Sequence, residues 1–251
     1  MILLFDVGNS NIFIGVSNDT NIFETHRMTT DSNKTADEIF VGLRNLFDVA
    51  KIKAIAISSV VPRVTEQLKD MSHRFFKIEP LIIGPGVKTG LNIKTDNPRE
   101  VGADLICDSV SINSAEIPSI IVDLGTATKF IYVKNKTIIG VVIMAGMQIS
   151  VESLVGNTAL LLDIDIEAPK KVLGTNTVTS MQSGITYGTA AMIEGMVEKI
   201  QNEMNEEANL IMTGGYAEII SPLCKLEHTV NVNLVLEGLL KIYQLNNPKK
   251  A

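Results

Sequence analysis

One carboxylate, two carboxamides and a hydroxyl lie close together near the amino terminus, in the segment Asp6-Val7-Gly8-Asn9-Ser10-Asn11. Apolar runs of strand-forming residues flank this segment and predict a β-hairpin with a polar turn. The backbone amides of such a turn can converge on a phosphate, and Asp6 suits a hydrated cation that accompanies it. An ordinary Gly-Asn turn explains the same pattern and stays open as the alternative.

The same plan occurs a second time in residues 120–133, where Asp123-Leu124-Gly125-Thr126-Ala127-Thr128 stands between two apolar runs. The separation of the two copies is that of a domain rather than of a short structural repeat. Two such hairpins facing each other across a cleft would present two polar turns to one nucleotide. The pair of turns resembles the arrangement of the actin, Hsc70 and sugar kinase superfamily.

A third carboxylate, Asp104, follows a predicted helix start. Asn97 at the cap and Pro98 in the first position predict that the helix begins near Pro98. Gly102 then falls inside the first turn, where it costs stability and so indicates close approach of a ligand or a neighbouring chain. The helix dipole favours an ionised Asp104, which fits either a general base or a solvated surface acid.

These carboxylates must be positioned by two α/β halves, which we place at 1–118 and 119–251. The amino-terminal half carries the first hairpin and the helix with the candidate base. The carboxy-terminal half carries the second hairpin and a long helix. The further strands are expected at 24–28, 53–61, 80–83, 136–144 and 210–213, and the helices after Thr35, at 64–75, after Asn176 and at 234–243.

Two glycine-containing segments invite a nucleotide-binding interpretation. The segment 84–90 lacks the glycine before Lys88-Thr89 that a phosphate-binding loop requires, so we expect a rigid loop. Thr213-Gly214-Gly215 follows a strand, where an adenine or ribose could lie against bare backbone. A tight strand-to-helix turn explains that segment equally well.

Composition restricts the class of protein. The chain has 251 residues, 45% of them hydrophobic, a net charge of -6 and a pI near 5.2, which argues against nucleic acid as a main partner. Cys107 and Cys224 are solitary, and the three histidines have no metal-ligand spacing. Neither a signal peptide nor a membrane span is expected, so a cytoplasmic enzyme fits best.

The sequence resembles type III pantothenate kinase across essentially its whole length. The matching stretches occur in order along the chain: 6–11, 58–62, 88–94, 97–104, 123–128, 181–184 and 213–215. The resemblance implies two ribonuclease H-like domains and a homodimer with shared active sites. It also implies ATP-dependent phosphorylation of pantothenate to 4'-phosphopantothenate, the first step toward coenzyme A.

The resemblance further implies a role for individual residues. Asp104 would be the general base, Asp6 would hold magnesium through water, and Asp123 would hold a monovalent cation such as K⁺ or NH₄⁺. ATP would contact Asp6, Val7, Gly8, Asn9, Ser10, Asn11, Ile12, Phe13 and Thr126. Pantothenate would contact Thr95, Gly102, Ala103, Asp104, Leu105 and, from the neighbouring subunit, Thr177.

Three departures from the family pattern concern these sites. Leu105 stands where an arginine is usual, Thr95 where a tyrosine is common, and Lys129 where a threonine is usual. An arginine facing the carboxylate of pantothenate would contribute roughly 1.5 to 3 kcal/mol, so its absence should weaken substrate binding. A catalytically impaired relative that binds a nucleotide or a protein is therefore the alternative to a working kinase, and a nucleotide phosphohydrolase is a more distant one.

Overall fold

The computed structural model describes residues 1–18, 20–112 and 117–248. The chain forms two compact α/β units. The first comprises the described parts of 1–92, 96–113 and 234–251, and the second those of 93–95 and 114–233. The last helix, expected in the second half, packs with the first unit.

The first unit is built on a five-stranded sheet with the order β3-β2-β1-β4-β5. β1 pairs antiparallel with β2 and parallel with β4, which confirms both the predicted hairpin and the predicted parallel pairing beside it. The strands are β1 (Ile2–Val7), β2 (Asn11–Ser17), β3 (Ile22–Thr29), β4 (Ala54–Ser59) and β5 (Leu81–Ile82).

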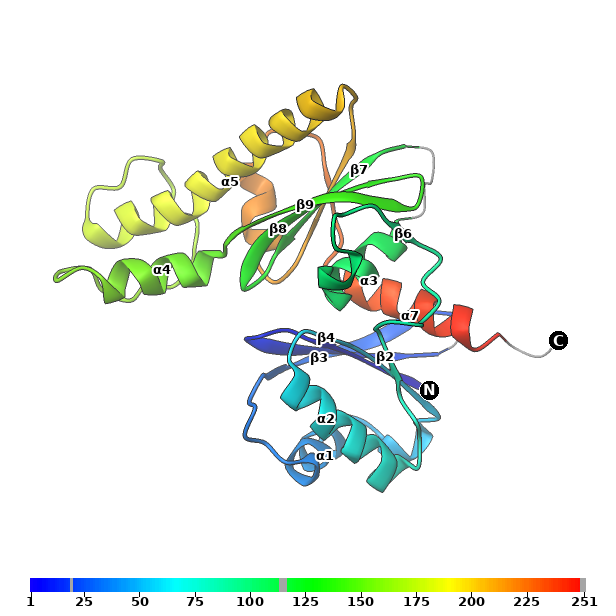
Figure 1. The fold of residues 1–251 in the computed structure, drawn as a ribbon. Helices are drawn as coiled ribbons and strands as arrows, with labels where there is room; N and C mark the ends of the chain where they lie inside the picture. Colours follow the sequence, from blue (N-terminus) through cyan, green and yellow to red (C-terminus); the bar gives the residue numbers. More distant parts are fainter. Residues whose placement is uncertain (19, 113–116, 249–251) are drawn as a thin grey trace. The chain divides into compact units, whose positions relative to one another are not determined.

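Helices cover both faces of this sheet (Figure 1). Side chains alternate along β1, so that Leu3 and Phe5 pack toward α1 and α2 while Ile2 and Leu4 pack toward α3 and α7. A β-carbon added at Gly238 of α7 would lie 1.8 Å from the Cys107 carbonyl oxygen, so glycine permits close packing of α7 on α3. The helices are α1 (Ala36–Arg44), α2 (Pro62–Met71), α3 (Ala103–Ser111) and α7 (Leu234–Asn246).

The second unit contains a six-stranded sheet with the order β11-β10-β7-β8-β9-β6. β7 pairs antiparallel with β8, as the second hairpin predicted, and parallel with β10. The strands are β6 (Asn92–Ile93), β7 (Ser119–Leu124), β8 (Ala127–Lys134), β9 (Thr137–Ala145), β10 (Asn209–Thr213) and β11 (Thr229–Val230).

One face of this second sheet packs against helices. Ile120, Val122 and Phe130 share a buried cluster with Ile193 and Val197 of the long helix α5. Asn176 caps α5, since its side chain accepts a hydrogen bond from the Thr179 amide at 2.9 Å. The helices of this unit are α4 (Met147–Gly156), α5 (Thr177–Met204) and α6 (Ala217–Ile220) (Figure 1).

The predicted helix start near Pro98 is wrong. Pro98–Glu100 forms an isolated 3-10 turn, and α3 begins only at Ala103, with Gly102 as its N-cap. Extended backbone at Val101 separates the turn from the helix. Asp104 therefore lies within the first turn of α3, where the helix dipole acts on it most strongly.

None of the helices among the described residues combines the length and the apolar character needed to cross a membrane.

Candidate active site

The amino-terminal turn is fixed by hydrogen bonds that leave its polar side chains in solvent. The Gly8 amide donates to the Asn11 carbonyl at 3.0 Å, and the Thr30 hydroxyl donates to the Gly8 carbonyl at 2.7 Å. Asn9, Ser10 and Asn11 are exposed. The turn therefore presents carboxamide, hydroxyl and backbone amide groups on a rigid frame, which suits an anionic ligand.

Asp6 stands near the end of β1, directly beside Ser58 of the parallel strand β4. The Ser58 hydroxyl donates to Asp6 Oδ1 at 2.9 Å, which orients the carboxylate. Oxygen donors of this kind are the ligands that Mg²⁺ prefers, usually with several waters retained. The residues around Asp6 thus fit a hydrated divalent cation.

The apolar residues beside the turn serve the fold. The side chains of Val7 and Ile12 are buried in the core of the first unit, so only their backbone is available to a ligand. Phe13 lies under the Arg27 guanidinium, whose carbon is 4.2 Å from the ring centroid.

Asp104 projects from the first turn of α3 and is partly exposed. A β-carbon built on Gly102 would lie 2.4 Å from Asp104 Oδ1. Gly102 has φ -60° and ψ 150°, a conformation open to any residue. Glycine at this position therefore leaves room for the Asp104 carboxylate as it is placed, and the backbone conformation does not require it.

Asp6 and Asp104 both lie near one buried thiol. Burial raises the pKa of Cys107 well above its usual value, and the charges of Asp6, Asp108 and Asp104 raise it further, while a hydrogen bond with Ser58 opposes them. Cys107 is therefore a neutral packing residue. The charges of both Asp6 and Asp104 act on this one thiol. Asp6, the predicted magnesium ligand, and Asp104, the predicted base, therefore lie in the same region of the first unit.

The second turn belongs to the second unit and is more tightly packed. Asp123 lies opposite Lys129 in the β7–β8 pairing and beside Thr213 of β10. The Lys129 ammonium nitrogen is 2.6 Å from Asp123 Oδ2. A β-carbon on Gly146 would lie 2.2 Å from the Thr126 carbonyl oxygen, so the backbone of Thr126 is held against the start of α4.

Thr213-Gly214-Gly215 forms the turn between β10 and α6. Gly214 has φ +92°, which favours glycine, and the Tyr216 amide donates to the Leu124 carbonyl at 3.2 Å. A tight strand-to-helix turn thus explains these glycines, and an adenine or ribose there stays a prediction.

The remaining candidate substrate residues have different surroundings. Ala103 is the first residue of α3 and partly exposed, whereas Leu105 is only 6% exposed. The Thr95 hydroxyl oxygen is buried and has no hydrogen-bond partner among the described residues.

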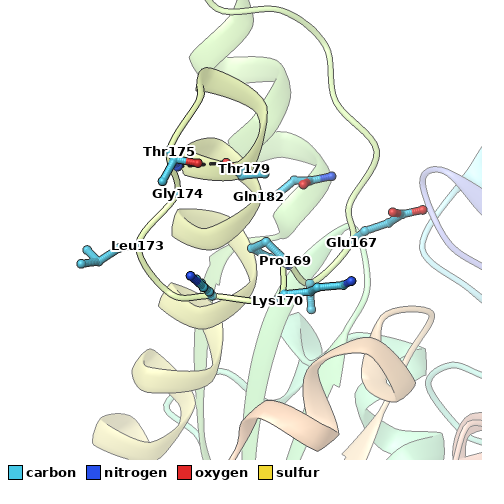
Figure 2. A pocket seen from close by; sticks show the side chains of 10 residues that line it. Glu167, Pro169, Lys170, Leu173, Gly174, Thr175, Thr179 and Gln182 are labelled. Atoms are coloured by element: carbon cyan, nitrogen blue, oxygen red, sulfur yellow. Dashed lines mark hydrogen bonds between the residues drawn. The ribbon is translucent and has the colours of Figure 1, made fainter.

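Two hollows lie beside the start of α5. Figure 2 shows the first, about 440 Å³ in volume and lined by residues of the segment 167–175 together with Thr179 and Gln182. The second, about 410 Å³, is lined by Thr177 and by mainly apolar side chains of α4 and α5 and of the connecting segment. Of the predicted site residues, Thr177 alone lines either hollow.

Sequence reasoning missed several contacts at these turns. Ser58 could have been found, because β1 and β4 are parallel and their carboxyl ends meet at one edge of the sheet. The Lys129 pairing could have been found from the register of the second hairpin. The surroundings of Cys107 depend on tertiary packing, for which no local signal exists. Among the described residues, His, Cys, Asp and Glu side chains form no group of three or more that could hold a metal ion.

Comparison with known proteins identifies relatives along the whole chain. The family model for type III pantothenate kinase matches residues 2–199. A type III pantothenate kinase from Acholeplasma laidlawii (strain PG-8A) is 50% identical over 246 residues, which cover 98% of this chain and 99% of that protein.

Two solved structures share the fold at low sequence identity. A protein described as a 2-dehydro-3-deoxygalactonokinase from Sinorhizobium meliloti superposes with a TM-score of 0.66 at 11% identity, covering 100% of this chain and 98% of its own. A protein described as a Baf family transcriptional activator from Campylobacter jejuni gives a TM-score of 0.62 at 18% identity, covering 97% and 98%. The expected α/β fold, with one sheet in each of two units, is thereby confirmed.

Proposed function

The chain belongs to the type III pantothenate kinase family, and we propose that residues of its two polar turns and Asp104 act in catalysis. The chain is an ATP-dependent kinase that phosphorylates pantothenate in coenzyme A biosynthesis. The observation that carries the site assignment is the location of Asp104, in the first turn of a helix and near the same buried thiol as Asp6.

Asp104 acts as the general base in this proposal. The helix dipole stabilises its ionised form, and Gly102 leaves its carboxylate room. A general base here only has to receive the proton of the attacking alcohol, so its contribution to the rate depends mainly on being held in the correct position. Phosphoryl transfer otherwise depends on positioning and on neutralising the charge of the phosphates.

The amino-terminal turn holds the ATP phosphates through its backbone amides and the side chains of Asn9, Ser10 and Asn11. Asp6, oriented by Ser58, receives magnesium through water. When bound with ATP, the metal ion supplies charge neutralisation for the transferred phosphoryl group. In the second unit, Thr126 contacts ATP, and a monovalent positive charge beside Asp123 is part of the proposed site.

In this proposal, pantothenate contacts Gly102 and Ala103 at the start of α3, and it contacts Thr95. Leu105 is apolar and buried, so it provides no charge for the carboxylate of pantothenate. We therefore expect weaker substrate binding than in a relative with arginine at this position.

A homodimer completes the site in this proposal, with Thr177 contributed by the partner subunit. Large apolar side chains are exposed along α4, the segment 158–176 and the start of α5, and patches of this kind mark association surfaces. Leu160 and Leu173 are 87% and 84% exposed. The exposed members are Ile149, Leu154, Leu160, Leu162, Val172, Leu173 and Val178.

The enzyme is expected in the cytoplasm, where pantothenate and ATP are available.

The substitution Asp104→Asn tests the assignment of the base. It should reduce kcat for pantothenate about 10²- to 10⁴-fold and leave ATP binding, measured by calorimetry, unchanged. Asp96→Asn is the matched control, because Asp96 is an exposed acid just before the 3-10 turn. Full activity of Asp104→Asn would remove the base from this position.

A further inference from the structure

Lys129 and Asp123 form an ion pair that the geometry of the hairpin imposes. The two residues lie directly opposite each other on the antiparallel strands β7 and β8, so their side chains emerge on the same face. The ammonium nitrogen is 2.6 Å from Asp123 Oδ2. The side chains of Lys129 and Asp123 are 15% and 14% exposed, so water screens the pair weakly.

Glycine backbone surrounds the rest of the Asp123 carboxylate. A β-carbon at Gly214 would lie 2.5 Å from Asp123 Oδ1, and one at Gly125 would lie 3.6 Å from the same oxygen. Any side chain at position 214 would therefore displace the carboxylate, and the positive φ of Gly214 disfavours one independently. Asp123 is confined between bare backbone and the Lys129 ammonium.

Another lysine of the same strand provides a comparison. Lys134 pairs with Glu206 at 2.6 Å, but their side chains are 37% and 25% exposed. Lys134 lies at the far end of β8 from the turn, beside the turn into β9. Of these two pairs, that of Lys129 is both the more buried and the one located at the predicted cation site.

A free monovalent cation does not fit beside Asp123 as the site stands. Oδ2 already holds a positive charge at contact distance, and a second cation on the same carboxylate would face that charge across a few ångströms in a weakly screened site. A lysine ammonium, NH₄⁺ and K⁺ are all compact monovalent cations with similar oxygen contact distances. The lysine is covalently tethered, so its effective concentration at the site does not depend on the salt in solution.

From this geometry we propose that the Lys129 ammonium replaces the free monovalent cation beside Asp123, which makes this kinase independent of K⁺ and NH₄⁺. The inference rests on the proposed function of the second turn. It assigns Lys129 as a positioning residue, which acts through Asp123 and the turn that follows it. The threonine usual at this position in the family carries no charge, so a site with threonine would need a cation from solution.

The test compares the wild-type enzyme with Lys129→Thr in KCl, NH₄Cl, NaCl and choline chloride at equal ionic strength. Two quantities are measured: the rate of pantothenate phosphorylation and the Tm without substrates. The wild-type enzyme should give the same rate and the same Tm in all four salts. Lys129→Thr should be slow in choline and sodium and recover in K⁺ or NH₄⁺. In either of these two salts, its Tm should exceed that in choline by about 3 to 6 °C at roughly ten times Kd.

Lys134→Thr is the matched control. It removes an ion pair from the same strand and should shift Tm equally in every salt. Lys129→Gln provides a second variant with a longer polar side chain if the threonine variant folds poorly.

Three results bear on the idea in different ways. Stimulation of the wild-type enzyme by K⁺ over choline would overturn it. A folded Lys129 variant whose rate and Tm respond to no cation would also overturn it, by showing that the ion pair is only structural. If no salt supports phosphorylation by any variant, the proposed function fails instead, and the Tm comparison still decides whether Lys129 occupies a cation site.

Discussion

The substitution Gly102→Ala tests whether the carboxylate of Asp104 is held in one position for catalysis. The added β-carbon would lie 2.4 Å from Asp104 Oδ1, whereas ordinary contact begins at 3.4 Å. The carboxylate oxygen must therefore move by the difference of about 1 Å, because the backbone of the helix start is held by packing.

The expected cost falls on catalysis rather than on folding. A misplacement of about 1 Å at a reacting group costs about 10²-fold in rate, or about 2.7 kcal/mol of activation free energy. The backbone of Gly102 has a conformation that alanine also adopts, and Asp104 can turn away. Alanine is a poorer N-cap residue than glycine, which lowers the stability of the folded state. Alanine also reduces the conformational freedom of the unfolded chain, which raises stability. The two effects roughly cancel, so the free energy of unfolding should change by less than about 1 kcal/mol.

Steady-state kinetics and chemical denaturation of Gly102→Ala measure these two quantities. Gly84→Ala is the control, since a β-carbon at Gly84 meets nothing within 4 Å and no positive φ is required there. The double variant Gly102→Ala, Asp104→Asn should be no slower than Asp104→Asn alone, because the effect of Gly102 acts through Asp104.

A folded Gly102→Ala enzyme with the wild-type kcat would refute this reasoning. The reasoning would also be refuted if Gly102→Ala slowed the Asp104→Asn variant by the same factor as it slows the wild-type enzyme. That result would show that the space at Gly102 serves the substrate directly.

Two further predictions concern stability and assembly. Burial raises the pKa of Cys107 in the folded state, so its contribution to stability is fully present below the unfolded pKa of about 8.5 and is lost as the pH rises above it. The free energy of unfolding should therefore fall in alkaline buffer, and Cys107→Ala should make that fall smaller. A pH profile of the wild-type protein that matches that of Cys107→Ala would contradict this account. The double substitution Leu160→Ser, Leu173→Ser should shift the protein from dimer to monomer in analytical ultracentrifugation, whereas Phe23→Ser, an exposed apolar residue on β3, should not. A dimer that survives the double substitution would place the subunit contact elsewhere.

Local sequence patterns were sufficient to predict most elements. The capping box at Thr35 forms as predicted, with the Glu38 amide donating to the Thr35 hydroxyl and the Glu38 carboxylate accepting from the Thr35 amide. Both hairpins form because apolar runs flank short polar turns. In each case, residues close in sequence determine the structure.

Elements that depend on tertiary packing could not be predicted in this way. α4 was missed because its sequence continues the apolar run of β9 without a helical pattern of polar residues. The start of α3 was placed five residues too early, at Pro98 instead of Ala103, because the Asn97-Pro98 signal forms only a 3-10 turn. The packing of α7 on the first unit involves residues far apart in sequence, which local patterns do not encode.

The candidate site likewise contains residues that local sequence patterns predict and residues whose surroundings depend on tertiary packing. The three aspartates were proposed as site residues from their positions in turns and at a helix start. Their neighbours, Ser58 beside Asp6 and Lys129 beside Asp123, follow from strand pairing and register. The buried side chain at Leu105 could not be foreseen from the sequence, because only packing decides whether a residue of an amphipathic helix start faces the interior.

The most direct test of the central claim follows the phosphoryl group itself. The wild-type protein is incubated with pantothenate, magnesium and ATP labelled with oxygen-18 in the γ-phosphate, and the products are identified by mass spectrometry. The account predicts 4'-phosphopantothenate that carries the labelled phosphoryl group, in equal amount to the ADP formed. Labelled inorganic phosphate as the main product would indicate a phosphohydrolase, and unchanged ATP and pantothenate would indicate a relative that binds without catalysis; either result would contradict the account.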